Sequence, residues 1–225
     1  LDAYSNMRTQ DNQSKERIYI QTFNPVVVQA NVQHQDYLYS FNAGTEYKNF
    51  NDFIQNEWED YLESKDGVTF LVFDEDEKTS QKKIVAFYTL CAGAIPYTDR
   101  WLIPEDERDE SGQEYDEQEC GIPSIEIKMF AVTEEYQDVF FAIDGEERPV
   151  SAWILHDIIS TIDNLTTSTI AAKAIFLHAV PSAEKFYLQN GFNYAHPSMH
   201  AFHSFDSEYA PMFLALSELH IHYDE

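Results

Sequence analysis

The sequence predicts a mixed α+β fold of the α/β class, with a central, mostly antiparallel sheet of about six or seven strands and helices on both faces. Two observations indicate it. Residues 122–132, 149–162 and 171–180 have the patterns of a strand, a helix and a buried strand, an order that makes two parallel strands joined by a right-handed crossover. The apolar runs 68–74 and 83–95 flank a charged loop, as in an antiparallel hairpin.

The remaining elements of the first half follow from periodicity. Residues 17–23 alternate between apolar and polar side chains and predict a strand. Residues 24–48 show no clear period, and we expect a loop with one helical turn. Apolar side chains recur at helical spacing over 50–62, and the pair Asp66-Gly67 then supplies a turn.

The second half begins with an acidic, turn-rich segment, 104–121, which we expect to form an exposed loop. The next strand, 122–132, should alternate its faces: Ile125, Ile127 and Met129 on one, Glu126, Lys128 and Phe130 on the other. Pro149 suits the first position of the following helix. Residues 181–192 predict a short helix that Asn190-Gly191 closes. Two further strands are expected within 193–217.

Length and charge limit the class of protein. In 225 residues that are 44% hydrophobic, we expect a flexible N-terminal arm at 1–16 and a single domain over 17–225. The chain has no apolar run long enough to span a membrane, and its formal net charge is −26. Such a charge repels phosphates, so we expect no nucleic acid and no membrane as partner, and cationic partners instead. Two distant cysteines fit the cytoplasm, and the sequence is compatible with a homodimer.

Two motifs carry a resemblance to a known family. SAEKFYLQNGF resembles the A-x-x-F/L-Y-x-x-x-G-F segment of the GCN5-related N-acetyltransferases (GNAT family), with matches at Ala183, Phe186, Tyr187, Gly191 and Phe192. EIKMFAVTEEYQ resembles the fourth strand of that family and its exit. The order of the expected elements over 17–217 is also similar to that of the family.

The resemblance implies acetyl-CoA as co-substrate, held between the fourth and fifth strands by the backbone of Phe130, Ala131 and Val132. It implies Glu126 as general base and Tyr187 as the acid that protonates the leaving thiolate. Each residue has a structural alternative, since Glu126 could simply pair with Lys128 and Tyr187 could be an aromatic packing residue. The activity implied is transfer of an acetyl group to a primary amine by direct attack.

The sequence departs from the family after the fourth strand. Family members continue with Q/R-x-x-G-x-G/A, whose N–H groups cradle the pyrophosphate, but here the run from Gln137 has Phe140 and Ala142 in the glycine places. Four carboxylates accompany this run, and Arg148 is its nearby cation. A divergent cradle could use Arg148, Val150 and Ser151 at the start of the next helix. The alternative is a catalytically inactive, acidic protein-interaction module.

The expected acceptor is a small molecule or protein that carries a cationic primary amine, because the acidic segment 104–121 could border the acceptor side of the cleft. We expect no metal site. The histidines near the C-terminus do not share one face of a regular element; they are His196, His200, His203, His220 and His222.

Overall fold

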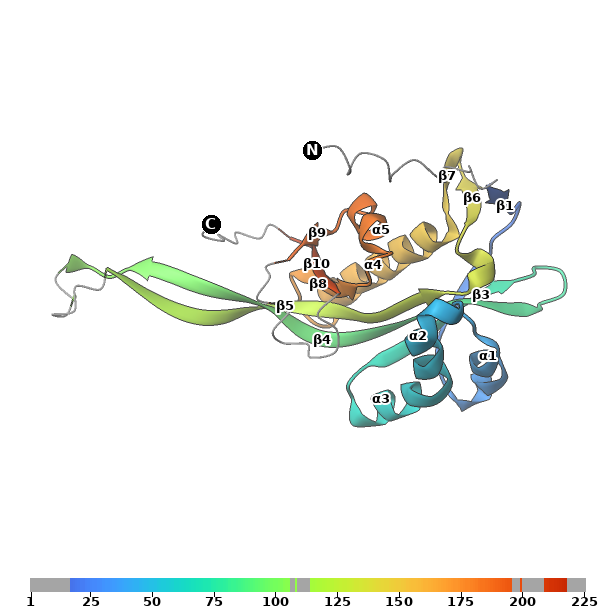
Figure 1. Ribbon diagram of the computed structural model, residues 1–225, viewed down its shortest axis with the longest axis horizontal. Helices are drawn as coiled ribbons and strands as arrows, with labels where there is room; N and C mark the ends of the chain where they lie inside the picture. The colour runs from blue at the N-terminus through green and yellow to red at the C-terminus, as the bar shows by residue number, and fades with distance from the viewer. Residues whose placement is uncertain (1–16, 106–107, 109–113, 196–198, 200–208, 218–225) are drawn as a thin grey trace, which may run out of the picture.

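The computed structural model describes residues 17–105, 108, 114–195, 199 and 209–217, and its core is a mixed sheet of seven strands (Figure 1). The strands lie in the order β2-β3-β4-β5-β8-β10-β9. They are β2 (Pro25–Gln29), β3 (Val68–Glu75), β4 (Lys82–Leu102), β5 (Tyr115–Val132), β8 (Ala174–Ala179), β10 (Ala210–Ala215) and β9 (Asn193–Tyr194). Within this sheet, β5 and β8 are the one parallel pair among the described strands, as the crossover pattern predicts.

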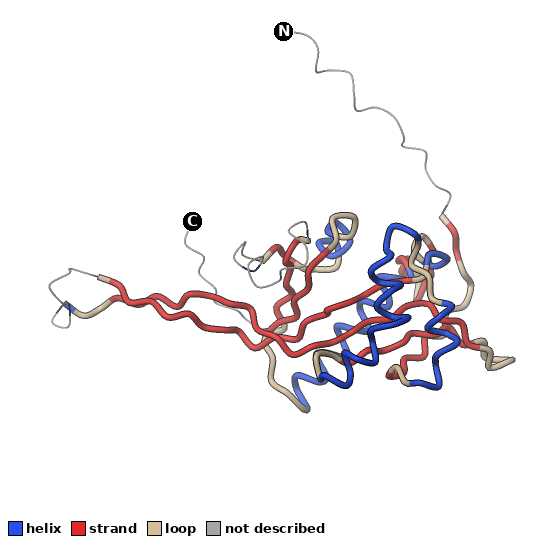
Figure 2. The backbone as a smooth tube through the Cα atoms, turned by 60° about the horizontal axis from the view of Figure 1, so that its bottom comes forward, coloured by secondary structure: helices blue, strands red, loops and turns tan. Residues whose placement is uncertain are grey.

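Helices cover both faces of this sheet (Figure 2). On one face, α4 (Val150–Ser168) buries an apolar stripe that includes Ile154 and Leu155 against the centre of the sheet. On the other face, α1 (Gln35–Ser40), α2 (Lys48–Asp52) and α3 (Trp58–Ser64) enclose a second, aromatic-rich core. A π-helical turn, Phe53–Glu57, joins α2 to α3, so the helix expected over 50–62 is confirmed with a local irregularity. Among the described residues, no helix has both the length and the apolarity needed to span a bilayer.

The N-terminal expectations need correction. In the segment 17–23 only β1 (Ile18–Tyr19) is a strand, and it lies outside the main sheet. The segment expected to be mainly loop, 24–48, instead contains the edge strand β2 as well as α1. The apolar run of β2 is too short to show a period, and its strand conformation depends on pairing with β3. The predicted arm at 1–16 lies outside the described residues.

The acidic segment 104–121 is also different from the expectation. Its second part, from Tyr115 onward, belongs to β5, which pairs with β4 as far as Leu102. The two strands form a ribbon that projects well beyond the rest of the sheet (Figure 1). Residues 115–121 of the acidic segment therefore lie in this projection, before the pairing of β5 with β8 begins at Ser124, because cross-strand pairing holds even a polar run as a strand.

A small second sheet is formed by residues that follow β5, where the family resemblance implied a loop. The strands β6 (Val139–Ile143) and β7 (Glu146–Pro149) form a hairpin, and β1 pairs in parallel with β6. Asp144 and Gly145 at the turn have φ angles of 52° and 85°, which is the backbone of the tightest hairpin turns. The hairpin leads directly into α4.

Candidate functional site

The parallel strands β5 and β8 separate partway along their length. They pair at Ser124–Ala174, Ile125–Ile175 and Glu126–Phe176 and no further, although β5 continues to Val132 and β8 to Ala179. Past Glu126, no strand in the described part of the chain pairs with the inner edge of β5. The candidate site is this opening at the carboxyl ends of the two strands, the usual place for ligands in parallel sheets.

A β-bulge in β5 lies where the separation begins. Leu90 of β4 is opposite Ile127, but Thr89 is opposite Met129, so Lys128 is the extra residue. A bulge bends its strand and increases the local twist, which turns the end of β5 away from β8. It also reverses the alternation of side chains: Met129 packs with the α1–α3 core and Phe130 with the α4 core. The predicted shared faces, Met129 with Ile127 and Phe130 with Glu126, are therefore wrong.

One hydrogen bond shows which backbone groups of β5 face the opening. The N–H of Thr133 donates to the carbonyl of Val85 on β4, at 2.8 Å. Because successive residues of a strand direct their polar groups to opposite sides, Ala131 also faces β4, whereas Phe130 and Val132 face the opening. The carbonyl of Val132 accepts a bond from Gln137 Nε2 at 3.0 Å. Of the three backbone positions proposed from the sequence, Phe130 and Val132 have the required direction.

Glu126 lies at the start of the opening beside a lysine and a histidine. Its Oε1 is 3.4 Å from Lys128 Nζ and 3.8 Å from His178 Nδ1. The carboxylate is buried and the imidazole nearly so. The pairing with Lys128 that the sequence offered as an alternative to catalysis is present. His178 was not singled out in the sequence; the register gives the signal, since it lies two residues beyond Phe176, the partner of Glu126.

Tyr187 lies on the other face of the sheet. It lies on α5 (Glu184–Gln189) and packs in the α4 core, with its ring 5.2 Å from that of Phe186 and 5.5 Å from that of Phe192. Phe186 in turn contacts Phe130, at 6.5 Å between ring centroids. Burial raises the pKa of the Tyr187 phenol above its usual value. Ile125 and Ile127, which flank Glu126 in β5, belong to the same α4 core as Tyr187, so the Glu126 side chain points to the opposite face of the sheet.

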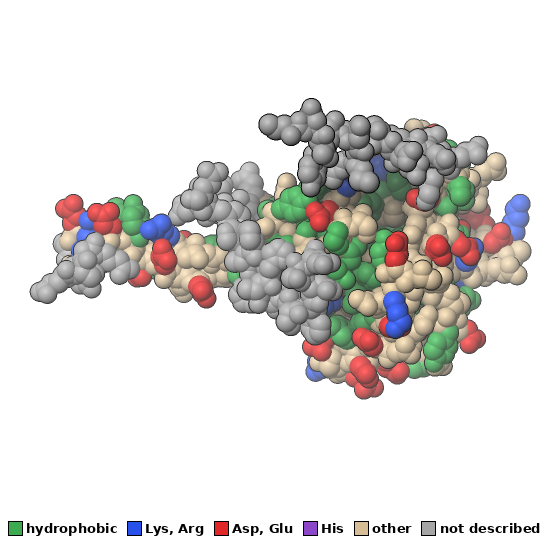
Figure 3. Space-filling model, viewed as in Figure 1, with side chains coloured by type: hydrophobic (Ala, Val, Ile, Leu, Met, Phe, Trp, Pro, Cys, Tyr) green, Lys and Arg blue, Asp and Glu red, His purple; other side chains and the backbone are tan. Residues whose placement is uncertain are grey.

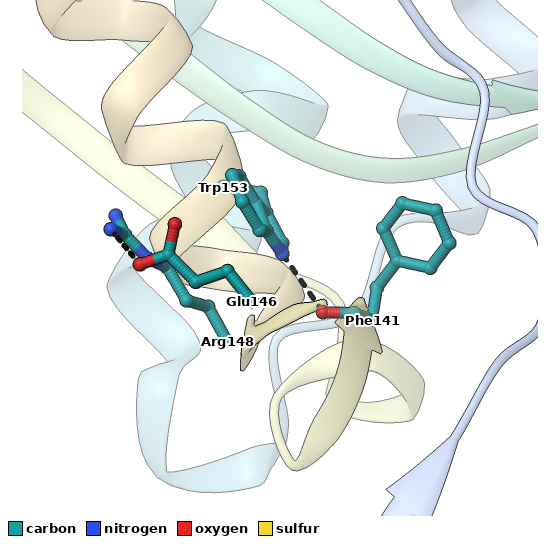
Figure 4. A network of polar contacts seen from close by, with 4 residues as sticks. All are labelled: Phe141, Glu146, Arg148 and Trp153. Carbon is teal, nitrogen blue, oxygen red and sulfur yellow. Dashed lines mark hydrogen bonds and ion pairs between the residues drawn. The ribbon is translucent and has the colours of Figure 1, made fainter. Parts of the chain in front are cut away.

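The β6–β7 hairpin packs against the first turn of α4 (Figure 4). The indole Nε1 of Trp153 donates to the carbonyl of Phe141 at 3.0 Å, which joins the helix to β6. The Arg148 guanidinium is engaged twice, since it forms an ion pair with Glu146 and lies over the Trp153 ring with its Cζ 5.2 Å from the centroid. In this arrangement Arg148 is directed to its own hairpin.

The N-terminus of α4 remains without a side-chain cap. Pro149 occupies the N-cap position and makes no side-chain hydrogen bond there. The side chain of Val150 is fully buried, so this residue could offer a ligand its backbone N–H alone, and Ser151 is half-buried. The first-turn N–H groups are thus candidates for binding an anion.

Other features lie apart from the opening. A surface hollow of about 450 Å³ lies between the end of β2 and α3, lined in part by Trp58 and Glu59. In the described part of the chain no three metal-binding side chains are grouped together. The five histidines weighed from the sequence (His196, His200, His203, His220 and His222) lie outside that part, so the expectation of no metal stays a prediction.

Several solved structures have a fold similar to that of this chain. A tyrosine-to-phenylalanine mutant of the AtaT toxin superposes with a TM-score of 0.58 at 15% identity, over 89% of this chain and 95% of that one. AtaTR bound with AcCoA gives 0.57 at 16% identity, over 85% and 93%. AtaT complexed with acetyl-methionyl-tRNAfMet gives 0.54 at 14% identity, over 85% and 95%. No protein-family model and no curated protein matches the sequence.

The chain has the GCN5-related N-acetyltransferase fold. The mixed sheet with helices on both faces that the sequence predicts is thereby confirmed. The opening between β5 and β8 is the place where the sequence resemblance implies that the pantetheine arm of acetyl-CoA would lie.

The residues present fit acetyl-CoA in one part of the site and oppose it in another. The outward-facing backbone of Phe130 and Val132 fits a pantetheine arm, and beside it the buried Thr133 hydroxyl has no hydrogen-bond partner among the described residues. At the phosphate end, the uncapped start of α4 is favourable, but Asp144, Glu146 and Glu147 bring negative charge close to it. Of the cradle that the resemblance implies, the helix N-terminus is present and the glycine loop is replaced by the β6–β7 hairpin.

Proposed function

We propose that the chain is an N-acetyltransferase that transfers an acetyl group from acetyl-CoA to a primary amine by direct attack. One observation carries the proposal: β5 and β8 stop pairing after Glu126–Phe176, next to a bulge at Lys128. Two parallel strands of one sheet would otherwise continue their hydrogen bonds, and a break there leaves backbone donors that an extended ligand can use as a neighbouring strand does.

The residues around the opening supply the groups that the reaction needs. Glu126 takes the proton of the ammonium group, directly or through water, so that the amine nitrogen can attack the thioester carbonyl carbon. The N–H of Phe130 or Val132 stabilises the negative charge that develops on the carbonyl oxygen. As the carbon–sulfur bond breaks, the nitrogen loses its second proton to water, Tyr187 gives its proton to the departing thiolate, and solvent returns a proton to Tyr187. Arg148, Val150 and Ser151 lie at the phosphate end.

The acceptor we propose is a cationic amine. The formal net charge of −26 attracts such a molecule and repels nucleic acid. One structural neighbour is complexed with an acetylated methionyl-tRNA, so the fold itself does not exclude a nucleic-acid acceptor, and the exclusion rests on charge alone. Both cysteines are free thiols, which supports a reducing compartment such as the cytoplasm.

Calorimetric titration with acetyl-CoA tests binding, and two variants then test the chemistry. We expect micromolar affinity, and release of CoA thiol when spermidine, glucosamine or a lysine peptide is added. Glu126→Gln should lower turnover by about 10² to 10⁴ while leaving acetyl-CoA affinity within about threefold. Lys128→Gln is the matched control, since it breaks the same ion pair and keeps the carboxylate. Equal turnover losses in both variants would show that Glu126 acts through its ion pair and not as a base.

The second candidate is a catalytically inactive interaction module. The engagement of Arg148 by Glu146 and Trp153, together with the hairpin carboxylates, favours it, since these contacts oppose phosphate binding. Absence of binding heat at millimolar acetyl-CoA would decide for this candidate.

A further inference from the structure

The outer part of the β4–β5 ribbon stands clear of the fold. Pairing of β3 with β4 ends at Leu90, and pairing of β8 with β5 begins at Ser124. Residues 96–102 and 115–121 therefore pair with each other, and no other described strand pairs with their outer edges. Figures 1 and 2 show this ribbon extending far from the helices. We refer to these two segments as the outer ribbon.

The outer ribbon exposes large apolar side chains near its end. Trp101 is 43% exposed, Leu102 57% and Tyr115 42%. Figure 3 shows apolar, acidic and basic side chains gathered at this end of the molecule. A two-stranded ribbon is only marginally stable alone, and exposed aromatic side chains with a polar surround are typical of protein-binding surfaces.

One face of the outer ribbon already binds a guanidinium from its own strand. Arg100 lies over the Tyr115 ring, with its Cζ 4.5 Å from the centroid, and its Nε is 3.2 Å from Glu117 Oε1. Alternation along the strands and the register of the pair place these three side chains on the same face. An aromatic ring beside a carboxylate is a favourable seat for an arginine.

The opposite face offers the same chemistry without an arginine of this chain. Trp101 is directly opposite Asp116, and Asp99 lies two residues earlier on the same face. Within the described segments, no lysine or arginine lies over the Trp101 ring or within ion-pair distance of Asp99 or Asp116. A partner's cationic side chain could thus stack on the indole and pair with either carboxylate.

Charge selects the kind of partner. Residues 98–121 contain ten Asp and Glu against two Arg, and both arginines are near carboxylates of the ribbon, Arg100 with Glu117 and Arg108 with Glu114. A second copy of this chain would bring the same formal charge of −26, which disfavours self-association through this surface. We propose that the Trp101 face of the outer ribbon is a docking surface for an arginine- or lysine-rich polypeptide segment.

Fluorescein-labelled nona-arginine is a suitable probe, titrated with the full chain at 150 mM NaCl. Trp101→Ser leaves the net charge unchanged and should weaken binding about three- to tenfold, the range of an exposed cation–π contact that becomes partly desolvated. Trp101→Tyr should restore affinity to within about twofold. The double variant Asp99→Asn/Asp116→Asn should weaken binding about tenfold.

The matched controls remove equal charge or an equal aromatic side chain from the body of the protein. Glu59→Gln/Glu63→Gln on α3 and Tyr39→Ser on α1 should each change affinity less than twofold. If the controls weaken binding as much as the ribbon variants, or if Trp101→Ser binds like the wild type, the peptide is held by overall charge and the docking surface is refuted. A dimer in sedimentation velocity that Trp101→Ser abolishes would also refute it, by assigning the surface to a second copy. The proposal is independent of acetyl transfer, so acetyl-CoA titrations should be the same for Trp101→Ser and wild type.

Discussion

Replacing Glu146 by glutamine should tighten the binding of acetyl-CoA, because it frees Arg148 and removes a negative charge beside the start of α4. The Arg148 and Glu146 side chains are 37% and 56% exposed, so their ion pair holds the arginine by only about 0.2–1 kcal/mol. At about 8 Å in water, loss of one carboxylate relieves about 0.5 kcal/mol of repulsion per phosphate charge. The two effects together give about 1 kcal/mol, or about fivefold in affinity.

Calorimetry at 150 mM NaCl with four variants separates the two effects. Glu147→Gln is the matched control, since it removes the same charge without releasing Arg148, and it should tighten binding by about twofold. Arg148→Gln should matter little alone, because the arginine already engages Glu146 and Trp153. In the Glu146→Gln background, Arg148→Gln should remove most of the gain. Equal affinities for Glu146→Gln and Glu147→Gln would refute the role of Arg148, and no change in any variant would show that the phosphates do not approach the hairpin.

Three further predictions concern single side chains. Tyr187→Phe should lower turnover by about tenfold or more. Because burial raises the pKa of Tyr187, ionisation of this phenol should not lower the wild-type rate between pH 8 and 10. A fall in the wild-type rate over this pH range that is absent from the variant would contradict the prediction. Burial raises the pKa of Cys91 to about 12, so at pH 8 about one Cys91 thiol in 10⁴ is ionised. Iodoacetamide should therefore label Cys91 at least a hundredfold more slowly than free cysteine. Full labelling of Cys91 within minutes, measured by mass spectrometry, would contradict the raised pKa. Ile154→Ala should lower the free energy of unfolding by about 2–5 kcal/mol, since the side chain is 2% exposed, whereas Ile170→Ala, at 50% exposed, should change it by less than about 0.5 kcal/mol in urea titrations.

Sequence patterns predicted the elements whose burial has a clear period. The parallel pair and α4 followed from a continuous apolar run and a helical stripe, and both are buried as expected. Gly191 was placed at the end of the short helix, and its φ angle of 89° is the conformation that favours glycine. The conformation of each of these elements is indicated by which of its own side chains are buried, so the local sequence pattern is sufficient to predict it.

The β6–β7 hairpin has a local signal in the sequence at its turn. Asp144-Gly145 directly after the apolar stretch Val139–Ile143 is a signal for a tight hairpin turn, and both residues do adopt positive φ. β2 had no comparable signal, since its strand conformation is set by β3. His178 could be placed beside Glu126 only once the register of β5 and β8 was known, because pairing between strands distant in sequence is not written in either strand.

A single extra residue links the fold to the proposed chemistry. Lys128 interrupts the pairing with β4, and the resulting bend accounts for both the loss of β8 as a partner and the transfer of Phe130 to the face where Phe186 lies. The strict alternation expected for 122–132 would have kept Glu126 and Phe130 on one face, with no reason for the strands to part. With the bulge, Glu126 and Tyr187 lie on opposite faces of the sheet, so a thioester in the gap would have the proposed base on one side and the proposed acid on the other. This arrangement suits a reaction in which the amine approaches the thioester from one side of the gap while the thiolate departs on the other. It depends on the register of β5 with β4 more than on the identity of Glu126 or Tyr187.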